Sequence, residues 1–150
     1  MAYQEKFMKR AIALAKKAKE NDEVPVGAVV VIDNKVIASA FNKRECLSDA
    51  TAHAEILAIK KACKKIGDFR LNGAEIYVTL EPCVMCMGAI INARIDNVYF
   101  GAKITNGSIS ADEISKRAEL NHKTRVEGGF FEEECSMLVS NYFKEKRKKD

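Results

Sequence analysis

Helical and strand patterns alternate along this chain, and their order restricts the folds that the chain can adopt. Apolar residues at helical spacing cover 3–20, 52–66, 83–93 and 131–147, with a less regular helical stretch at 111–120. Short β-type runs cover 26–32, 35–41, 74–80, 97–102 and 124–129. The order helix, hairpin, helix, strand, helix, strand, helix is typical of an α/β protein whose helices cover a mixed sheet.

Turn and cap residues indicate where these segments end. Asp33-Asn34 separates two strand-like runs and suits a tight hairpin turn. The polar stretch 42–49 is expected to form a loop, after which Asp49 or Thr51 caps the second long helix. Gly67 then ends that helix, because glycine readily adopts the left-handed conformation of a helix C-terminus.

Composition agrees with one globular domain, residues 1–150. Hydrophobic residues make up 47% of the chain and charged residues 31%, which excludes a disordered protein. No apolar run is long enough to span a membrane, and we see no secretory signal, so we expect a cytoplasmic protein. The five cysteines do not suggest the disulfide framework of a small secreted domain.

Three residues at two expected helix starts have the chemistry of zinc ligands. Pro82 is expected to open a helix at the first-turn position that proline tolerates best, with Cys83 and Cys86 on one face of that helix. His53 lies thirty residues earlier, at the start of another helix. One imidazole and two thiolates leave the fourth position of a tetrahedral zinc ion open to water, as in catalytic sites.

A catalytic zinc site also needs a group that moves protons, and Glu55 follows His53 by two residues. A carboxylate at this place is expected to act as the proton shuttle without binding the metal. On a regular helix the two side chains would lie on different sides. The first turn must therefore bring the long Glu55 side chain to the metal.

Other interpretations of these residues are open. A C-x-x-C pair also occurs in redox proteins, and a closed structural zinc site would use His122 or Cys135 as a fourth ligand. The closed site corresponds to a third hypothesis, a non-catalytic RNA-binding protein with structural zinc. We rank that hypothesis below the open site, because neither residue lies in a short-range ligand pattern and Glu55 would have no role.

The end of the chain is strongly basic. Five of the last seven residues, "KEKRKKD", are lysine or arginine. A lysine run at a terminus is usually a solvated helix end, but it can also bind phosphates. The composition alone favours the first interpretation.

The joint pattern "HAE" and "PCVMC" resembles the zinc-dependent nucleobase deaminases. Longer stretches resemble the bacterial tRNA-specific adenosine deaminases, which convert the wobble adenosine of a tRNA anticodon to inosine. These stretches are "EVPVGAVVV", "TAHAEILAI", "YVTLEPCVMCMGAIINARI", "VYFGA" and "NHKTRVEGGFFEEECSMLVSNYFKEKR". The resemblance runs from about Phe7 to Arg147 and implies a three-layer α/β/α, cytidine deaminase-like fold with a mixed, roughly five-stranded sheet.

The resemblance implies roles for individual residues. One Zn²⁺ per subunit is bound by His53, Cys83 and Cys86, and Glu55 is the catalytic proton shuttle. The target base is bound by Asn42, Ala54, Val26 and Leu80. The resemblance also implies a homodimer, a tRNA anticodon stem-loop as the partner, and phosphate contacts for the basic C-terminus.

Two segments depart from the family pattern. Asp49-Ala50-Thr51 replaces the familiar Asp-Pro-Thr before the histidine, which is a small change in loop stiffness. The segment 103–110, "KITNGSIS", is shorter than in the family and has Ile104 where an aspartate is expected. Because that loop faces RNA in the family, a free nucleobase or nucleoside (guanine, adenine or cytosine) is the alternative substrate.

Overall fold

The computed structural model describes residues 2–104, 108–117 and 120–149. The described helices are α1 (Glu5–Glu20), α2 (Arg44–Leu47), α3 (Ala54–Ile66), α4 (Val84–Asn92), α5 (Ala111–Ser115) and α6 (Glu132–Lys149). The described strands are β1 (Gly27–Ile32), β2 (Lys35–Phe41), β3 (Glu75–Leu80), β4 (Asn97–Ala102) and β5 (Arg125–Glu127).

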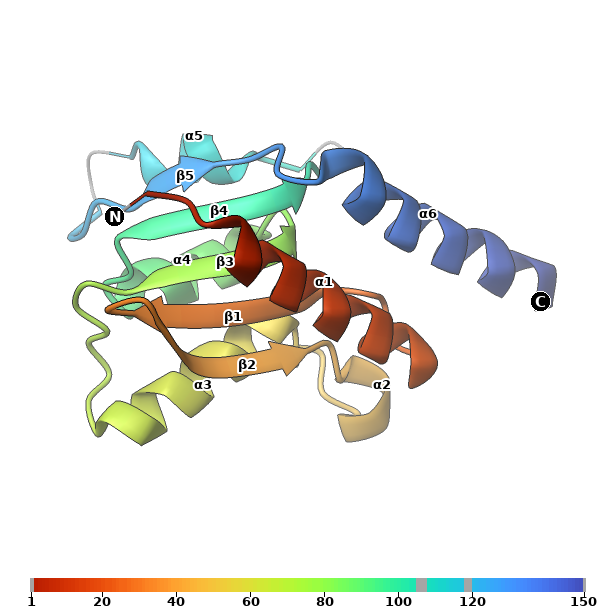
Figure 1. Ribbon diagram of the computed structural model, residues 1–150, viewed down its shortest axis with the longest axis horizontal. Coiled ribbons are helices and arrows are strands. Elements are labelled where there is room, and N and C mark those ends of the chain that lie inside the picture. The colour runs from red at the N-terminus through yellow and green to blue at the C-terminus, as the bar shows by residue number, and fades with distance from the viewer. Residues whose placement is uncertain (1, 105–107, 118–119, 150) are drawn as a thin grey trace.

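The strands form one mixed sheet with the order β2-β1-β3-β4-β5. β1 is antiparallel to β2 and β3, whereas β3, β4 and β5 are parallel to one another. Figure 1 shows α1 on one face of the sheet and α3 and α4 on the other. The expected three-layer architecture with a five-stranded mixed sheet is therefore confirmed.

Both faces of the sheet are buried, and alternate residues of β1 serve the two faces. Ala28 and Val30 belong to the core beneath α3, α4 and α5. Val29 and Val31 pack with α1 and with Cys135 of α6. A strand covered on both faces reads as a continuous apolar run, which explains "GAVVVI".

The β1–β2 hairpin has the turn that Asp33-Asn34 predicted. Both residues have positive φ angles, 51° and 63°. A two-residue turn with both residues in the left-handed region matches the right-handed twist of the paired strands. Gly67 likewise ends α3 in the left-handed conformation, as expected.

Several boundaries differ from the expectation. The stretch 42–49 is not entirely loop, because α2 forms within it. Neither Asp49 nor Thr51 caps α3: Asp49 Oδ1 instead accepts hydrogen bonds from the backbone N–H and the hydroxyl of Thr51. The cap residue is His53, and the first N–H of α3 donates to Asn42 Oδ1.

Two further helix boundaries were predicted incorrectly. Pro82 does not occupy the first turn of α4, because Cys83 is the N-cap and the proline precedes it. α5 ends at Ser115 rather than near residue 120, and residues 118–119 lie outside the described part of the chain. Ser110 starts α5 by accepting a hydrogen bond from the backbone N–H of Glu113.

The fold brings two helix starts to one edge of the sheet. β3 and β4 are parallel, so their carboxyl ends, at Leu80 and Ala102, lie side by side. α4 starts just beyond the end of β3, and α3 packs against α4 on the same face. Binding sites in α/β sheets commonly lie beyond the carboxyl ends of such strands. None of the helices described is both long and apolar enough to cross a membrane.

Candidate metal centre and substrate pocket

His53 and Cys83 occupy the same position relative to their helices. Each is the extended residue immediately before a helix, with φ and ψ of −70° and 153° for His53 and −74° and 176° for Cys83. Cys86 follows in the first turn of α4 and is fully buried. The two helix starts thus aim one imidazole and two thiols at a common point.

The three donor atoms have the separation that zinc requires. His53 Nδ1 lies 3.8 Å from Cys83 Sγ and 3.5 Å from Cys86 Sγ, and all three donor atoms lie within 4.8 Å of one another. Tetrahedral zinc, with bonds of about 2.3 Å to sulfur and about 2.0 Å to nitrogen, places nitrogen and sulfur about 3.5 Å apart. The residues therefore fit a zinc ion as they stand.

No fourth protein ligand joins this group in the part of the chain that the structure describes. His122 Nε2 instead lies 3.1 Å from the carbonyl oxygen of Ile95. Cys135 packs in the core on the α1 side of the sheet. Among the described residues, the closed four-residue zinc site is therefore not formed, and the donor set leaves one coordination position open.

Hydrogen bonds among the three side chains shift their pKa values. Hydrogen bonds from Cys86 and His53 hold the pKa of the Cys83 thiol well below its usual value. The hydrogen bond with Cys83, together with burial, raises the pKa of Cys86. The hydrogen bond with Cys83 also raises the pKa of His53, against the effect of burial. A zinc cation displaces such protons when it binds.

Glu55 is the second residue of α3, and its side chain is only 4% exposed. Because His53 precedes the helix in extended conformation, the two side chains are not separated by a regular helical turn, and both line one pocket. Burial raises the pKa of Glu55 to about 7. A carboxyl group with a pKa near neutrality readily takes up and returns a proton.

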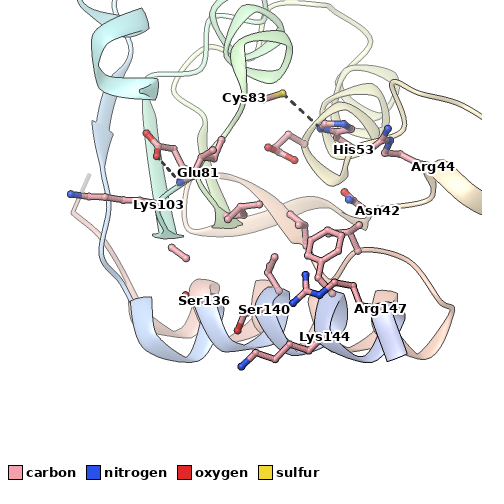
Figure 2. Close-up of a pocket in the computed structure, with 18 residues that line it drawn as sticks. Asn42, Arg44, His53, Glu81, Cys83, Lys103, Ser136, Ser140, Lys144 and Arg147 are labelled. Carbon is pink, nitrogen blue, oxygen red and sulfur yellow. Dashed lines mark hydrogen bonds between the residues drawn. The ribbon is translucent and has the colours of Figure 1, made fainter. Parts of the chain in front are cut away.

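A pocket of about 590 Å³ opens above these residues. Val26 and Leu80 lie in its wall, as does Phe143 from α6. Figure 2 shows His53 and Cys83 on one side of the pocket and the α6 residues Ser136, Ser140, Lys144 and Arg147 across from them. The pocket therefore has a metal-binding end and a wall contributed by the C-terminal helix.

Asn42 lies in the pocket wall and is only 6% exposed. Its Oδ1 accepts a hydrogen bond of 2.7 Å from the backbone N–H of Ala54. Because the oxygen must face that donor, the Nδ2 amide group points the other way. Asn42 thus satisfies the first backbone N–H of α3 and presents a hydrogen-bond donor to the pocket. Ala54 is buried, uses its N–H in this bond and is not among the pocket-lining residues.

Four cations line the pocket, and we call them the mouth cations. They are Arg44, Lys103, Lys144 and Arg147, and all four are exposed. The basic C-terminus predicted the last two. Sequence reasoning missed Arg44, Ser136 and Ser140, because their chain segments carry no motif. The only available signal was the proximity of Arg44 to Asn42 in the sequence.

The segment 103–110, which differs from the family pattern, also contributes to this pocket. Lys103 and Ile104 line it, whereas residues 105–107 lie outside the described part of the chain. The backbone N–H of Ile104 donates to Glu81 Oε1 at 3.0 Å. An apolar residue therefore stands in the wall where the resemblance led us to expect an aspartate.

Comparison with known proteins agrees with this geometry. The family described as "Cytidine and deoxycytidylate deaminase zinc-binding region" matches residues 1–102. The tRNA-specific adenosine deaminase of Bacillus subtilis (strain 168) is 47% identical over 99% of this chain and 94% of its own length. The enzyme of that name from Agrobacterium fabrum is 43% identical over the full length of both chains.

Solved structures of deaminases are also similar to this chain. A chain from a study of A-to-I editing by tRNA:A34 deaminases at the wobble position is 43% identical, with a TM-score of 0.86 over 91% of this chain and 100% of that one. Guanine deaminase from Bacillus subtilis is 37% identical, with a TM-score of 0.66 over 81% of this chain and 83% of its own. The chain therefore belongs to the zinc-dependent cytidine and deoxycytidylate deaminase family, among the relatives of the tRNA-specific adenosine deaminases.

Proposed function

We propose that this protein hydrolyses adenosine to inosine at the wobble position of a tRNA anticodon. The observation that carries the proposal is the juxtaposition of a zinc-binding triad and a buried Glu55 in one pocket that four exposed cations also line. The full-length similarity to tRNA-specific adenosine deaminases supports the choice of substrate.

We assign the metal to His53, Cys83 and Cys86. When bound there, zinc supplies the Lewis acidity that lets water attack a carbon atom at neutral pH. Glu55 takes a proton from the attacking water and delivers it to N1 of the adenine ring. It then takes the second proton, from the hydroxyl group now on C6, and delivers it to the departing amine. The C6–N bond breaks and ammonia leaves, with the oxygen of water now on C6.

The base is held by groups between the metal and the mouth of the pocket. The amide nitrogen of Asn42 donates to a ring acceptor of adenine, and Val26 and Leu80 pack against the ring. Ala54 contributes indirectly, because its backbone N–H fixes the orientation of the Asn42 amide. The arrangement suits one planar base that enters edge-on toward the metal.

The mouth cations suit a nucleotide that is still part of an RNA chain. A base buried at the metal leaves its flanking phosphates near the protein surface, where Arg44, Lys103 and the α6 cations lie. A free base has no phosphate for these residues to bind. The pocket chemistry thus favours the anticodon loop over the free-base alternative.

The enzyme acts as a single deaminase domain, in the cytoplasm, as a homodimer. Five free cysteines suit a reducing compartment. The full-length similarity to the tRNA-specific adenosine deaminases supports the homodimer, and Val84, which is 64% exposed next to Cys83, is the residue that we assign to its interface. A partner at this position would complete the wall of the RNA site.

The substrate is tested by incubating the zinc-loaded enzyme with an anticodon stem-loop that carries adenosine at position 34. Matched reactions contain free adenosine, adenine, guanine or cytosine. Inosine should form in the stem-loop alone. Deamination of a free base, with an unreacted stem-loop, would instead establish the alternative function.

A further inference from the structure

Two buried glutamates that do not bind the metal lie next to the pocket. The side chain of Glu23 is 1% exposed and that of Glu81 is 7% exposed. A buried carboxylate is costly unless hydrogen-bond donors satisfy it. In both glutamates the donors are backbone N–H groups of a segment distant in sequence.

Glu23 holds the first turn of α2. Its Oε1 accepts from the N–H of Glu45 at 3.0 Å, and its Oε2 accepts from the N–H of Cys46 at 2.8 Å. Glu23 is itself fixed to the end of α1, because its N–H donates to the carbonyl oxygen of Ala18. The carboxylate therefore ties the segment that carries Arg44 to a rigid helix.

Glu81 holds the segment after β4 in the same way. Its Oε1 accepts from the N–H of Ile104 at 3.0 Å, and its Oε2 accepts from the N–H of Ala111 at 2.9 Å. The backbone N–H of Glu81 donates to the carbonyl oxygen of Ala102. The carboxylate therefore ties the segment that carries Lys103 to the end of β3, two residues before Cys83.

The two segments lie on different sides of the pocket. In Figure 2, Lys103 and Arg44 are on opposite sides of the view, with Asn42 and Glu81 between them. Each side carries one exposed mouth cation. On each side, a buried carboxylate that uses both oxygens therefore fixes the position of the backbone that carries the cation.

We propose that Glu23 and Glu81 are positioning residues for the deaminase reaction. Each fixes one side of the pocket mouth, Glu23 through Arg44 and Glu81 through Lys103, so that the two cations meet the phosphates on the two sides of the target nucleotide. This inference rests on the proposed RNA substrate. It assigns a kinetic role to carboxylates that never touch the reacting atoms.

The test uses Glu23→Gln and Glu81→Gln, with Glu75→Gln as the control. Glutamine keeps the shape but has one acceptor oxygen, so its NH₂ group would face one of the two backbone N–H donors. Glu75 is also buried on β3 but does not line the pocket. KM for the stem-loop should rise about tenfold or more in the first two variants, with kcat within about threefold of wild type. The control should leave KM unchanged.

A double-mutant cycle with the cations separates positioning from stability. Arg44→Ala and Lys103→Ala change exposed side chains, so they should fold normally and raise KM by themselves. Adding Glu23→Gln to Arg44→Ala, or Glu81→Gln to Lys103→Ala, should raise KM little further, because each pair acts through one contact. Zinc content should stay at one per chain throughout.

Several results would overturn the inference. They are an unchanged KM in Arg44→Ala and Lys103→Ala, fully additive effects within each pair, or a loss confined to kcat or zinc content. If either glutamine variant does not fold, the two alanine variants alone decide the matter. No inosine from the wild-type enzyme would refute the proposed function itself, which is a separate outcome.

Discussion

At the scale of single residues, the centre depends on two side chains that leave the backbone just before a helix. His53 and Cys83 are both extended N-cap residues, so their side chains project past the helix ends rather than along a helix face. This placement removes the difficulty of the two-residue spacing between His53 and Glu55. On a continuous helix the two residues would diverge.

Because Glu55 and the zinc ligands have separate roles, variants of Glu55 should keep zinc, whereas variants of the ligands should lose it. Glu55→Ala should lower turnover by at least about 10²-fold and keep one zinc per chain, because the carboxylate moves protons and does not bind the metal. His53→Ala and Cys83→Ala should lose zinc and activity together. Metal analysis of the purified variants, beside an inosine assay, gives both values. Wild-type activity in Glu55→Ala would refute the mechanism.

Glu75 predicts a pH effect on stability that does not involve the pocket. Burial raises the pKa of Glu75, and the hydrogen bond from the Tyr99 hydroxyl opposes this only in part. Its Oε1 has no hydrogen-bond partner among the described residues. The folded protein therefore binds this proton more tightly than the unfolded chain. The contribution of Glu75 to stability is highest below its ordinary pKa of 4.5 and falls as pH rises through the higher folded value.

Glu75→Gln should accordingly raise the free energy of unfolding at pH 7. The advantage should shrink toward zero as the pH falls to about 4, where Glu75 is protonated in the folded and unfolded states. Denaturant unfolding of both proteins at several pH values measures the difference. A variant that is less stable than wild type at pH 7 would contradict this account.

At the scale of helices and strands, hydrophobic periodicity predicted most elements, but it did not predict whether an apolar face packs in the core or lines the pocket. The spacing of Leu138, Val139, Tyr142 and Phe143 gives α6 an apolar side. The structure buries Tyr142, leaves Phe143 42% exposed and turns Val139 and Phe143 toward the pocket. Periodicity shows that a face is apolar, but it does not distinguish a core from a binding pocket.

α6 is placed by a close approach to the sheet. A Cβ on Gly101 would lie 2.5 Å from Cys135 Sγ, so only glycine lets the first turn of α6 approach β4. The Tyr142 hydroxyl donates to the carbonyl oxygen of Asp22, which ties the helix to the end of α1. These two interactions hold the cations of α6 opposite the metal centre.

The position of α6 predicts which of its basic residues bind RNA. Lys144→Ala with Arg147→Ala should weaken stem-loop binding and reduce the slope of log K against log salt by about 1 for each phosphate that the variant no longer binds. Lys148→Ala is the matched control, since Lys148 is exposed on the same helix but does not line the pocket. Binding curves at several salt concentrations give the slopes. Equal slopes in the double variant and wild type would exclude α6 from phosphate binding.

At the scale of the whole molecule, the site is assembled from segments that lie far apart in the chain, from Val24 to Arg147. The sequence predicts His53, Cys83 and Cys86 as ligands, because short stretches of it contain both the ligand residue types and their spacing at helix starts. Arg44, Glu23 and Glu81 were not predicted, because their roles arise from segments that only the folded sheet brings together. The same holds for Ser136 and Ser140, which reach the pocket solely because α6 crosses it.

The dimer is a prediction at this scale as well. Val84 is exposed and follows Cys83 directly in the chain, and we place it in the interface with a second subunit. Sedimentation of the purified protein should give twice the chain mass, and Val84→Glu should shift the equilibrium toward monomer. A monomeric mass together with full activity on the stem-loop would contradict a partner in the site.

Oxygen-18 water tests the central claim, hydrolytic deamination of an RNA adenosine in this pocket, most directly. The enzyme is incubated in labelled water with a stem-loop that carries adenosine at position 34 and further adenosines elsewhere. Mass spectrometry of the digested RNA should find inosine at position 34 alone, with one oxygen from the solvent, and none with Glu55→Ala. Unlabelled inosine, inosine at other positions, or equal product from Glu55→Ala would contradict the account.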